Sequence, residues 1–394
     1  MRPAYKKYSS TNKRKQHSRS NSRRKKSTLD PQLLVKKAVI SEQKEFVSKR
    51  EYCSMPIHQS LRDALAIKGY VKPTEIQDRT LEALLDKRDL LGIAQTGTGK
   101  TGAFLIPIIN QLIENKSNPF AIVVVPTREL AIQVQEEFRS MTKGLKLFSA
   151  CFIGGTNINK DLQALRRNSH VIIGTPGRIL DLVNRKALDL RKLNTLILDE
   201  FDRMLDMGFV HDVKKIIHGM QNRKHTLLFS ATLNDKQKNL IKDILNNPVT
   251  VKISNGSTTG DNINQDIIRI SQEDDKFKIL LEMLNRSSFK KILVFEETKH
   301  RVNRLCAKLN KAGIKSDQIQ GNKSQNARQK ALGKFKRGEI KVLVATDVAA
   351  RGIDISDITQ VINYQVPESF DSYIHRIGRT GRAGKTGEAY TFVD

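Results

Sequence analysis

Short apolar runs alternate with amphipathic stretches along most of the chain. Between residues 52 and 253 these runs are rich in Val, Ile and Leu and are bounded by Gly, Pro or charged residues, which is typical of buried parallel strands. Helical patterns separate the runs, and this alternation predicts a doubly wound α/β sheet. The predicted strands are Leu90–Ala94, Ala121–Val125, Val171–Gly174, Leu196–Leu198 and Thr226–Phe229, and the clearest helices are Thr101–Asn115, Arg128–Ser140 and Phe209–Met220.

A polar, Gly-containing stretch over residues 254–262 interrupts the pattern and indicates a linker. The alternation then resumes, so we predict a second α/β domain. Its expected strands are Asp266–Ile270, Ile292–Phe295, Lys341–Ala345, Gln360–Asn363 and Ala389–Val393, and its expected helices are Asp274–Asn285, His300–Lys311 and Asn326–Arg337. The predicted organisation is a tail (1–28), an N-terminal extension (29–51), domain 1 (52–253), a linker (254–265) and domain 2 (266–394).

The net charge of the chain predicts a polyanionic partner for the two domains. The chain has 69 Lys and Arg against 41 Asp and Glu, a formal net charge of +28, which favours nucleic acid as a partner. Residues 1–28 contain eleven basic residues and no acidic ones, so we expect a disordered tail. The tail is either a solvated segment or an electrostatic arm for phosphates.

Cysteine content and hydropathy indicate where in the cell the protein is located. The three cysteines are far apart and form no Cys-x-x-Cys pair, which argues against a disulfide framework and fits a reducing compartment. The longest apolar run is far shorter than the roughly 18 residues of a membrane span. We therefore expect a cytoplasmic protein without a membrane anchor, although the basic tail leaves nuclear or organellar targeting open.

A phosphate-binding loop is the clearest chemical signal. Residues 94–101 read Ala-Gln-Thr-Gly-Thr-Gly-Lys-Thr and lie between a predicted strand and a predicted helix. Glycines allow successive backbone N–H groups to face a phosphate, and the helix N-terminus adds positive potential. Lys100 supplies a cation for the outer phosphates and Thr101 a hydroxyl for Mg²⁺.

An acidic pair completes the expected hydrolytic site. Asp199 and Glu200 directly follow the strand Leu196–Leu198, and strand ends of a parallel sheet converge on the ligand crevice. Asp199 is expected to hold Mg²⁺, and Glu200 to orient and deprotonate the attacking water. The predicted reaction is therefore nucleoside triphosphate hydrolysis.

A basic cluster in domain 2 is expected to complete the site across the domains. Arg376, Arg379 and Arg382 lie within seven residues. We interpret Arg379 and Arg382 as arginine fingers that neutralise charge on the transferred phosphate when the domains close. A solvated basic turn is the alternative. Asp354, which follows a strand and a turn, is a candidate acceptor for a ribose hydroxyl.

In combination, these motifs resemble the DEAD-box RNA helicases of superfamily two, over nearly all of residues 52–394. The segment 69–77 resembles the family's adenine-reading motif, 126–131 its first RNA-backbone motif, and 230–232 its Ser-Ala-Thr motif. The resemblance implies two RecA-like domains with ATP and RNA bound across their cleft. It implies ATP contacts from Tyr52, Gln77, Gln95, Thr96, Gly97, Thr98, Gly99, Lys100, Thr101 and Asp354; RNA-backbone contacts from Pro126, Thr127, Arg128, Gly155, Thr175, Gly177, Arg178, Thr298, Arg328 and Thr346; and coupling through Asp202, Ser230, Thr232 and His375.

Three departures from the family pattern stand out. The namesake motif reads Asp199-Glu200-Phe201-Asp202, with Phe in place of Ala, and an added ring commonly costs about 1–3 kcal/mol unless a pocket accommodates it. Gln320 replaces a common His and Lys299 a common Arg, which is expected to weaken RNA contacts. The sequence ends at Asp394, just after the last expected strand, so we expect a lean second domain.

The resulting hypothesis is an ATP-dependent RNA helicase that unwinds short duplexes or remodels RNA–protein complexes, with ribosome-assembly factors among its conceivable partners. The family prior is a monomer that uses ATP and Mg²⁺. An ATP-gated RNA clamp with little turnover is the first alternative, and a DNA helicase is the second. The ability to distinguish RNA from DNA rests on contacts to the 2′-hydroxyl.

Overall fold

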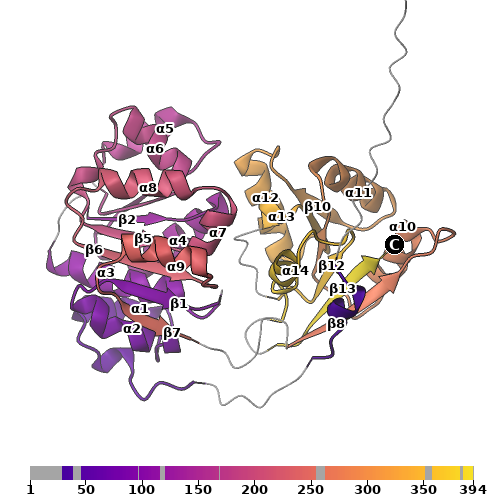
Figure 1. The fold of residues 1–394 in the computed structure, drawn as a ribbon, viewed down its shortest axis with the longest axis horizontal. Helices are drawn as coiled ribbons and strands as arrows, with labels where there is room; N and C mark the ends of the chain where they lie inside the picture. Colours follow the sequence, from indigo (N-terminus) through magenta and orange to yellow (C-terminus); the bar gives the residue numbers. More distant parts are fainter. Residues whose placement is uncertain are drawn as a thin grey trace, which may run out of the picture.

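The computed structural model describes residues 29–38, 46–95, 97–115, 120–167, 169–253, 262–350, 357–381 and 385–393. These residues form two separate sheets flanked by helices (Figure 1), and each pair of neighbouring strands in both sheets is parallel. The predicted fold class is therefore confirmed. The predicted basic tail over residues 1–28 lies outside the described residues.

The first sheet has seven strands in the order β3-β4-β2-β5-β6-β1-β7. Its strands are β1 (Leu90–Ile93), β2 (Ala121–Val124), β3 (Ser149–Phe152), β4 (Val171–Gly174), β5 (Thr195–Leu198), β6 (His225–Ser230) and β7 (Val249–Lys252). Its helices are α1 (Gln59–Ile67), α2 (Glu75–Leu85), α3 (Lys100–Glu114), α4 (Arg128–Met141), α5 (Ile158–Leu165), α6 (Pro176–Asn184), α7 (Phe201–Asp206), α8 (Val210–Gly219) and α9 (Asp235–Ile244), with short 3₁₀ turns at Tyr52–Ser54 and Leu190–Lys192.

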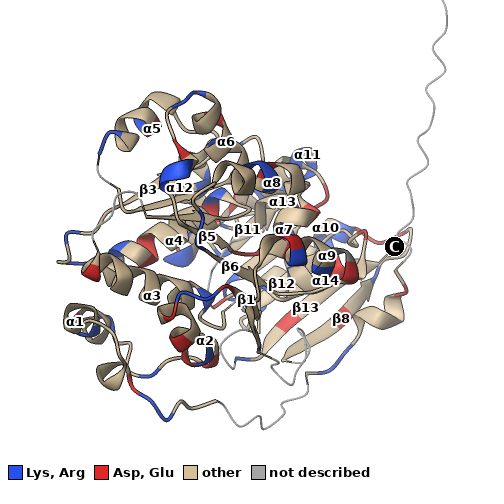
Figure 2. Cartoon of the chain, turned by 60° about the vertical axis from the view of Figure 1, so that its left-hand side comes forward, with Lys and Arg blue, Asp and Glu red and all other residues tan. Residues whose placement is uncertain are grey.

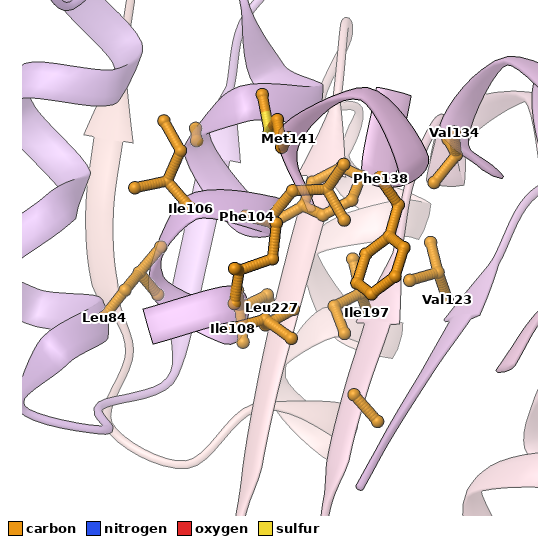
Figure 3. Close-up of a cluster of buried hydrophobic side chains, with 14 of the residues drawn as sticks. Leu84, Phe104, Ile106, Ile108, Val123, Val134, Phe138, Met141, Ile197 and Leu227 are labelled. Atoms are coloured by element: carbon orange, nitrogen blue, oxygen red, sulfur yellow. The ribbon is translucent and has the colours of Figure 1, made fainter. Parts of the chain in front are cut away.

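Side chains of the central strands point alternately to the two faces of this sheet and pack into two hydrophobic cores, one on each face. On β2, Ala121 and Val123 belong to one cluster of buried side chains, whereas Ile122 and Val124 belong to the other. Figure 3 shows part of the first cluster, in which Phe104 of α3 and Phe138 of α4 lie over Ile197 and Leu227 of the sheet. Burial on both faces explains why the central strands are continuous apolar runs.

The second sheet has six strands in the order β10-β11-β9-β12-β13-β8. Its strands are β8 (Ile263–Arg269), β9 (Ile292–Phe295), β10 (Ser316–Ile319), β11 (Val342–Ala345), β12 (Gln360–Asn363) and β13 (Gly387–Val393). Its helices are α10 (Lys276–Leu284), α11 (Lys299–Lys311), α12 (Gln325–Lys336), α13 (Asp347–Ala350) and α14 (Phe370–Ile377). No described helix is both long and apolar enough to cross a bilayer.

The strands that the hydrophobic pattern did not predict lie at sheet edges. These are β3, β7 and β10, each of which is the last strand on one side of its sheet. Residues in β3 alternate between buried and half-buried, and β7 buries only Val251. Such strands carry polar residues and lack the apolar run on which the prediction depended. The second sheet also begins at Ile263, earlier than the boundary expected at residue 266.

Phe201 of the Asp-Glu-Phe-Asp motif is accommodated by the core. Its side chain is fully buried, and it belongs to the cluster formed by α6, α8 and the second face of the first sheet. The added ring therefore fills space in the apolar interior of domain 1.

We expect Phe201→Ala to destabilise domain 1 and not to relieve strain. Truncating a fully buried Phe leaves a cavity and typically costs roughly 3–5 kcal/mol. Chemical denaturation of the variant and of Phe209→Ala, a less buried phenylalanine of the same cluster, measures the difference. If Phe201→Ala were as stable as the wild type or more stable, the ring would be strained in the wild-type protein.

Candidate nucleotide and RNA site

Predicted site residues of domain 1 follow the carboxyl ends of its parallel strands. The neighbours β5, β6 and β1 lead into the acidic pair, the Ser-Ala-Thr segment and the phosphate loop. The neighbours β3, β4 and β2 lead into the predicted RNA-backbone residues. Carboxyl ends of parallel strands meet at one edge of the sheet. This edge therefore has a nucleotide half and an RNA half.

The phosphate loop connects β1 to α3, as predicted. Gly97 and Gly99 have left-handed backbones, with φ of +90° and +96°, a conformation that glycine adopts without cost. Lys100 is buried, and its Nζ donates a hydrogen bond to Ala94 O at 2.7 Å. Thr101 is the second residue of α3, so its hydroxyl lies at the N-terminal end of the helix, where anions are stabilised.

Gln77 connects the predicted adenine-reading segment to the phosphate loop. Its Oε1 accepts hydrogen bonds from Thr74 N at 2.9 Å and from the Tyr52 hydroxyl at 2.8 Å. Its Nε2 donates to Gly99 O at 3.0 Å. A Cβ atom on Gly99 would lie 2.9 Å from that nitrogen and 2.5 Å from Thr74 Oγ1. The glycine is thus required both by its φ angle and by this close packing.

Tyr52, for which the resemblance implies an ATP contact, is 2% exposed, and its ring packs edge-on against Tyr70 with centroids 6.1 Å apart. Its contact with ATP stays a prediction. In this arrangement Tyr52 orients Gln77 through its hydroxyl.

The acidic pair lies in the interior at the end of β5. Asp199 is 2% exposed and Glu200 is 5% exposed. Burial raises the pKa of Asp199 to about 6, although the positive charge of Lys100 opposes this shift. Asp199 Oδ1 accepts a hydrogen bond from Glu200 N at 2.9 Å. The carboxylate and the ammonium group of Lys100 therefore share one buried site.

Arg203 holds Glu200, a contact that the sequence analysis missed. Arg203 Nη1 lies 3.0 Å from Glu200 Oε2, and both side chains are 6% exposed. Glu200 itself has φ of +53° and ψ of +49°, a left-handed conformation that costs a non-glycine residue about 1–2 kcal/mol. The signal was an arginine three residues after an acid at the start of a helix.

Asp202 joins the acidic motif to the Ser-Ala-Thr segment. Its Oδ2 accepts hydrogen bonds from Ala231 N, Thr232 N and Thr232 Oγ1, each at 3.2 Å. Ser230 Oγ in turn donates to Thr232 O at 2.7 Å. The structure thus brings together three of the four residues that the resemblance assigned to coupling.

The RNA half of the edge brings together Arg128 and Gly155. The Arg128 guanidinium lies so close to the turn that a Cβ on Gly155 would be 2.4 Å from Nη1. Thr127 and Thr175 are the N-cap residues of α4 and α6. Pro126 is buried beside Thr127, whereas Gly177 is exposed, with open space around it.

Arg178 is engaged within domain 1. Its Nε lies 2.7 Å from Asp161 Oδ2, and its Nη2 donates to Thr156 O at 2.6 Å. Its guanidinium therefore supports the turn that follows Gly155. The RNA contact that the resemblance implies for Arg178 stays a prediction.

In domain 2, Arg376 and Arg379 have different surroundings. Arg376 makes a two-point ion pair with Asp347, with N···O distances of 2.6 and 2.7 Å, and also donates to Gln365 O. Arg379 is 3% exposed, and its Nε donates to the backbone oxygen of His375 at 3.3 Å. Arg376 therefore anchors α14, and Arg379 follows immediately beyond the helix end.

Glu129 connects the two domains. Its Oε1 lies 3.1 Å from Gln325 Nε2 and 3.1 Å from Arg328 Nη2 on α12. Glu129 and Arg328 are 4% and 7% exposed. Arg328, which was predicted to contact RNA, thus forms a buried ion pair with the residue after Arg128. Glu129 could not be identified from local sequence, because its partners are about 200 residues away.

Two other predicted RNA residues of domain 2 precede helices. Thr298 is the exposed N-cap of α11, and Thr346 lies immediately before α13. The substituted positions are also connected: Gln320 Oε1 accepts from Asn322 N, and Lys299 Nζ donates to Asn322 Oδ1. Thr96, Asp354 and Arg382 lie outside the described residues.

Donor chemistry at the nucleotide half fits a magnesium-bound triphosphate. Backbone N–H groups at a helix N-terminus and a buried ammonium suit phosphates. A hydroxyl and a carboxylate suit Mg²⁺, which retains several waters as ligands. Two α/β domains with such a loop at the edge of the first define a P-loop nucleotide hydrolase with tandem RecA-like domains.

Comparisons with known proteins specify the family. The DEAD/DEAH box helicase model matches residues 74–240, and the helicase conserved C-terminal domain model matches residues 275–384. The DEAD-box ATP-dependent RNA helicase CshA of Bacillus licheniformis is 44% identical over 337 residues, which cover 86% of this chain and 69% of that protein. CshA of Geobacillus kaustophilus is also 44% identical, over 86% and 72%.

Comparison with solved structures agrees with this family assignment. Dbp5 of S. cerevisiae bound to RNA and ADP BeF3 has a TM-score of 0.77 and 33% identity, over 87% of this chain and 89% of that chain. Mss116p bound to ssRNA and AMP-PNP has a TM-score of 0.78 and 29% identity, over 89% and 76%. The chain belongs to the DEAD-box family of ATP-dependent RNA helicases, and it is an ATP-hydrolysing enzyme of that family.

Proposed function

We propose that the protein couples ATP hydrolysis to local RNA unwinding or RNP remodelling through contacts between its two domains. The observation that carries this proposal is the buried Glu129–Arg328 ion pair. It joins the RNA half of domain 1 to the domain 2 helix that was predicted to bind RNA. RNA bound there would contact both domains, so its binding would favour their association.

Hydrolysis would use groups from both domains. Lys100 would bind the outer phosphates, and Mg²⁺, held by Thr101 and Asp199, would neutralise phosphate charge. Glu200, oriented by Arg203, would accept a proton from the attacking water. Arg379 would stabilise the charge on the transferred phosphate once domain 2 lies over domain 1. Arg382 and Asp354 keep their predicted roles in this proposal.

RNA would be held without base readout. The predicted contacts are hydroxyls, helix N-termini and guanidinium groups, which bind a phosphate backbone. Figure 2 shows Lys and Arg along α11 and α12 of domain 2, adding positive charge next to Thr298 and Arg328. These features support binding that does not depend on RNA sequence.

We further propose a monomer that works in the cytoplasm. Both the hydrolytic groups and the predicted RNA contacts lie within one chain, so a second copy is not required to complete the site. Cys53, Cys151 and Cys306 are free thiols, which fits a reducing compartment.

Steady-state ATP hydrolysis without nucleic acid, with single-stranded RNA and with DNA of matching sequence tests the proposal. We expect strong stimulation by RNA and little by DNA, because 2′-hydroxyl contacts distinguish the two. Equal stimulation by DNA would contradict the RNA assignment. ATP-dependent RNA binding without turnover would identify a clamp.

A further inference from the structure

The chain segment before the family-matched region is anchored to both domains. The family model of the first domain begins at residue 74, so residues 29–51 lie outside it. Figure 1 shows the described parts of this segment, in indigo, beside β8 and β13 of domain 2 and running toward α2 of domain 1. The N-terminal end of the segment contacts domain 2, and its C-terminal end contacts domain 1.

The first anchor is Leu34 on domain 2. Leu34 ends a short 3₁₀ helix (Pro31–Leu34) that Asp30 caps. Its side chain is fully buried in a cluster with Ile263, Tyr373, Ile377 and Ala389. The Tyr373 hydroxyl donates a hydrogen bond to Leu34 O at 3.3 Å.

The same anchor extends the edge of the second sheet. Lys36 and Gln265 exchange two backbone hydrogen bonds, of 3.0 and 2.7 Å, in an antiparallel bridge. Ala38 N donates to Asn264 Oδ1 at 2.9 Å. Because β8 is the edge strand, these contacts satisfy backbone groups that would otherwise face solvent.

The second anchor is a polar network on α2 of domain 1. Ser48 is 2% exposed, and its Oγ donates to Asp78 Oδ2 at 2.8 Å. Arg50 Nε donates to Asp78 Oδ1 at 2.6 Å, and Arg50 also pairs with Glu82. Two side chains of the segment, Ser48 and Arg50, thus contact the same helix.

Each anchor lies next to one half of the proposed nucleotide site. Tyr373 is on α14, which also carries His375 and Arg376 and ends just before Arg379. Asp78 directly follows Gln77, whose amide contacts the phosphate loop. The segment therefore connects the arginine-bearing helix to the predicted adenine-reading helix.

We propose that residues 29–51 are an interdomain tether that positions α14 relative to α2, an inference that rests on the nucleotide site proposed above. Eight peptide steps separate the anchored Ala38 from Phe46. At about 3.6 Å per residue they span at most roughly 29 Å. A tether of this length keeps the arginine-bearing domain at a high effective concentration near the nucleotide. Leu34 is its positioning residue on domain 2, and on the domain 1 side the segment continues covalently into Tyr52.

Releasing the domain 2 anchor tests the tether, with a matched control one residue away. Leu34→Asp removes the buried anchor, whereas Leu33→Asp changes a side chain that is 58% exposed. Arg50→Met removes polar contacts next to the covalent junction with domain 1 and lengthens the free span without releasing it, and Lys49→Met changes an exposed neighbour. We expect Leu34→Asp to raise the RNA concentration for half-maximal ATPase roughly tenfold, with kcat at saturating RNA unchanged and the other three variants close to the wild type.

A double variant separates a tether from two local stabilising contacts. Changes at distant sites ordinarily add, but the two ends of this tether are not equivalent, because the domain 1 end is held by the covalent chain. Leu34→Asp combined with Arg50→Met is therefore expected to match Leu34→Asp alone. Unchanged half-saturation in Leu34→Asp, or a further increase in the double variant, would overturn the proposal. Leu34→Ala, with thermal unfolding followed for each variant, serves if Leu34→Asp unfolds domain 2.

The two proposals fail in different ways. The tether predicts a change in half-saturating RNA concentration at constant kcat. An error in the proposed catalytic site would instead appear as normal kcat in a Glu200 variant. A tether without effect on RNA half-saturation thus leaves the catalytic assignment standing.

Discussion

Glu200→Gln is expected to abolish turnover while ATP and RNA still bind. An amide cannot accept the proton of the attacking water, and loss of a general base typically slows a reaction by about 10²–10⁴-fold. The substitution preserves shape, and its amide oxygen can still accept the hydrogen bond from Arg203 that Glu200 accepts at 3.0 Å. Binding groups such as Lys100 and Arg128 are untouched, so affinity is expected to remain.

Single-turnover hydrolysis and equilibrium RNA binding with ATP measure the two halves of this prediction. Glu136→Gln is the matched control, because Glu136 is an exposed acid on α4. Normal hydrolysis by Glu200→Gln would show that another group is the base. Loss of RNA binding together with hydrolysis would show that Glu200 acts in assembly of the site.

Arg379→Gln and Arg376→Gln are expected to fail for different reasons, although the two arginines are three residues apart. Removing an arginine finger typically lowers kcat by roughly 10³-fold or more, and we expect this of Arg379→Gln. Arg376 instead forms a two-point ion pair with Asp347, in which the Arg376 side chain is 4% exposed and that of Asp347 is 32% exposed. Removing one partner of a fully buried pair costs about 3–5 kcal/mol, and solvent at Asp347 lowers that cost, so Arg376→Gln is expected to destabilise domain 2 by less than this.

Thermal unfolding and RNA-stimulated ATPase of both variants test this division. Arg337→Gln, which removes a largely exposed arginine paired with Glu339, is the control for loss of one positive charge. A stable Arg376→Gln protein without activity would place Arg376 at the phosphate. Full activity of Arg379→Gln would remove Arg379 from the catalytic groups.

The central strands and the hydrolytic motif were predictable because local sequence carries their physical requirements. Strands buried on both faces, such as Ala121–Val124, must be apolar at every position. A loop that wraps phosphates needs glycines with positive φ, as at Gly97 and Gly99. A few adjacent residues satisfy each requirement, so the pattern is visible without knowledge of the fold.

Edge strands and long-range side-chain contacts were not predictable in this way. In β10, residues Ser316 to Ile319 are mostly polar, and the strand is defined by its pairing with β11. The contacts of the Arg178 guanidinium with Asp161 and Thr156 likewise depend on the fold. Burial of Phe201 likewise depends on the space left between α6, α8 and the sheet, which no local pattern encodes.

What the sequence by itself determined is the fold class and the family: two α/β domains, a glycine-containing loop between a strand and a helix, and an acidic pair at a strand end. Only the tertiary structure decided which distant groups meet. Glu129 meets Arg328 across the domains, and the Tyr373 hydroxyl meets Leu34 O, 339 residues earlier in the chain. Such contacts depend on how whole elements pack, because a side chain's partner is set by spatial proximity and not by sequence separation. The tether between the domains belongs to this second class.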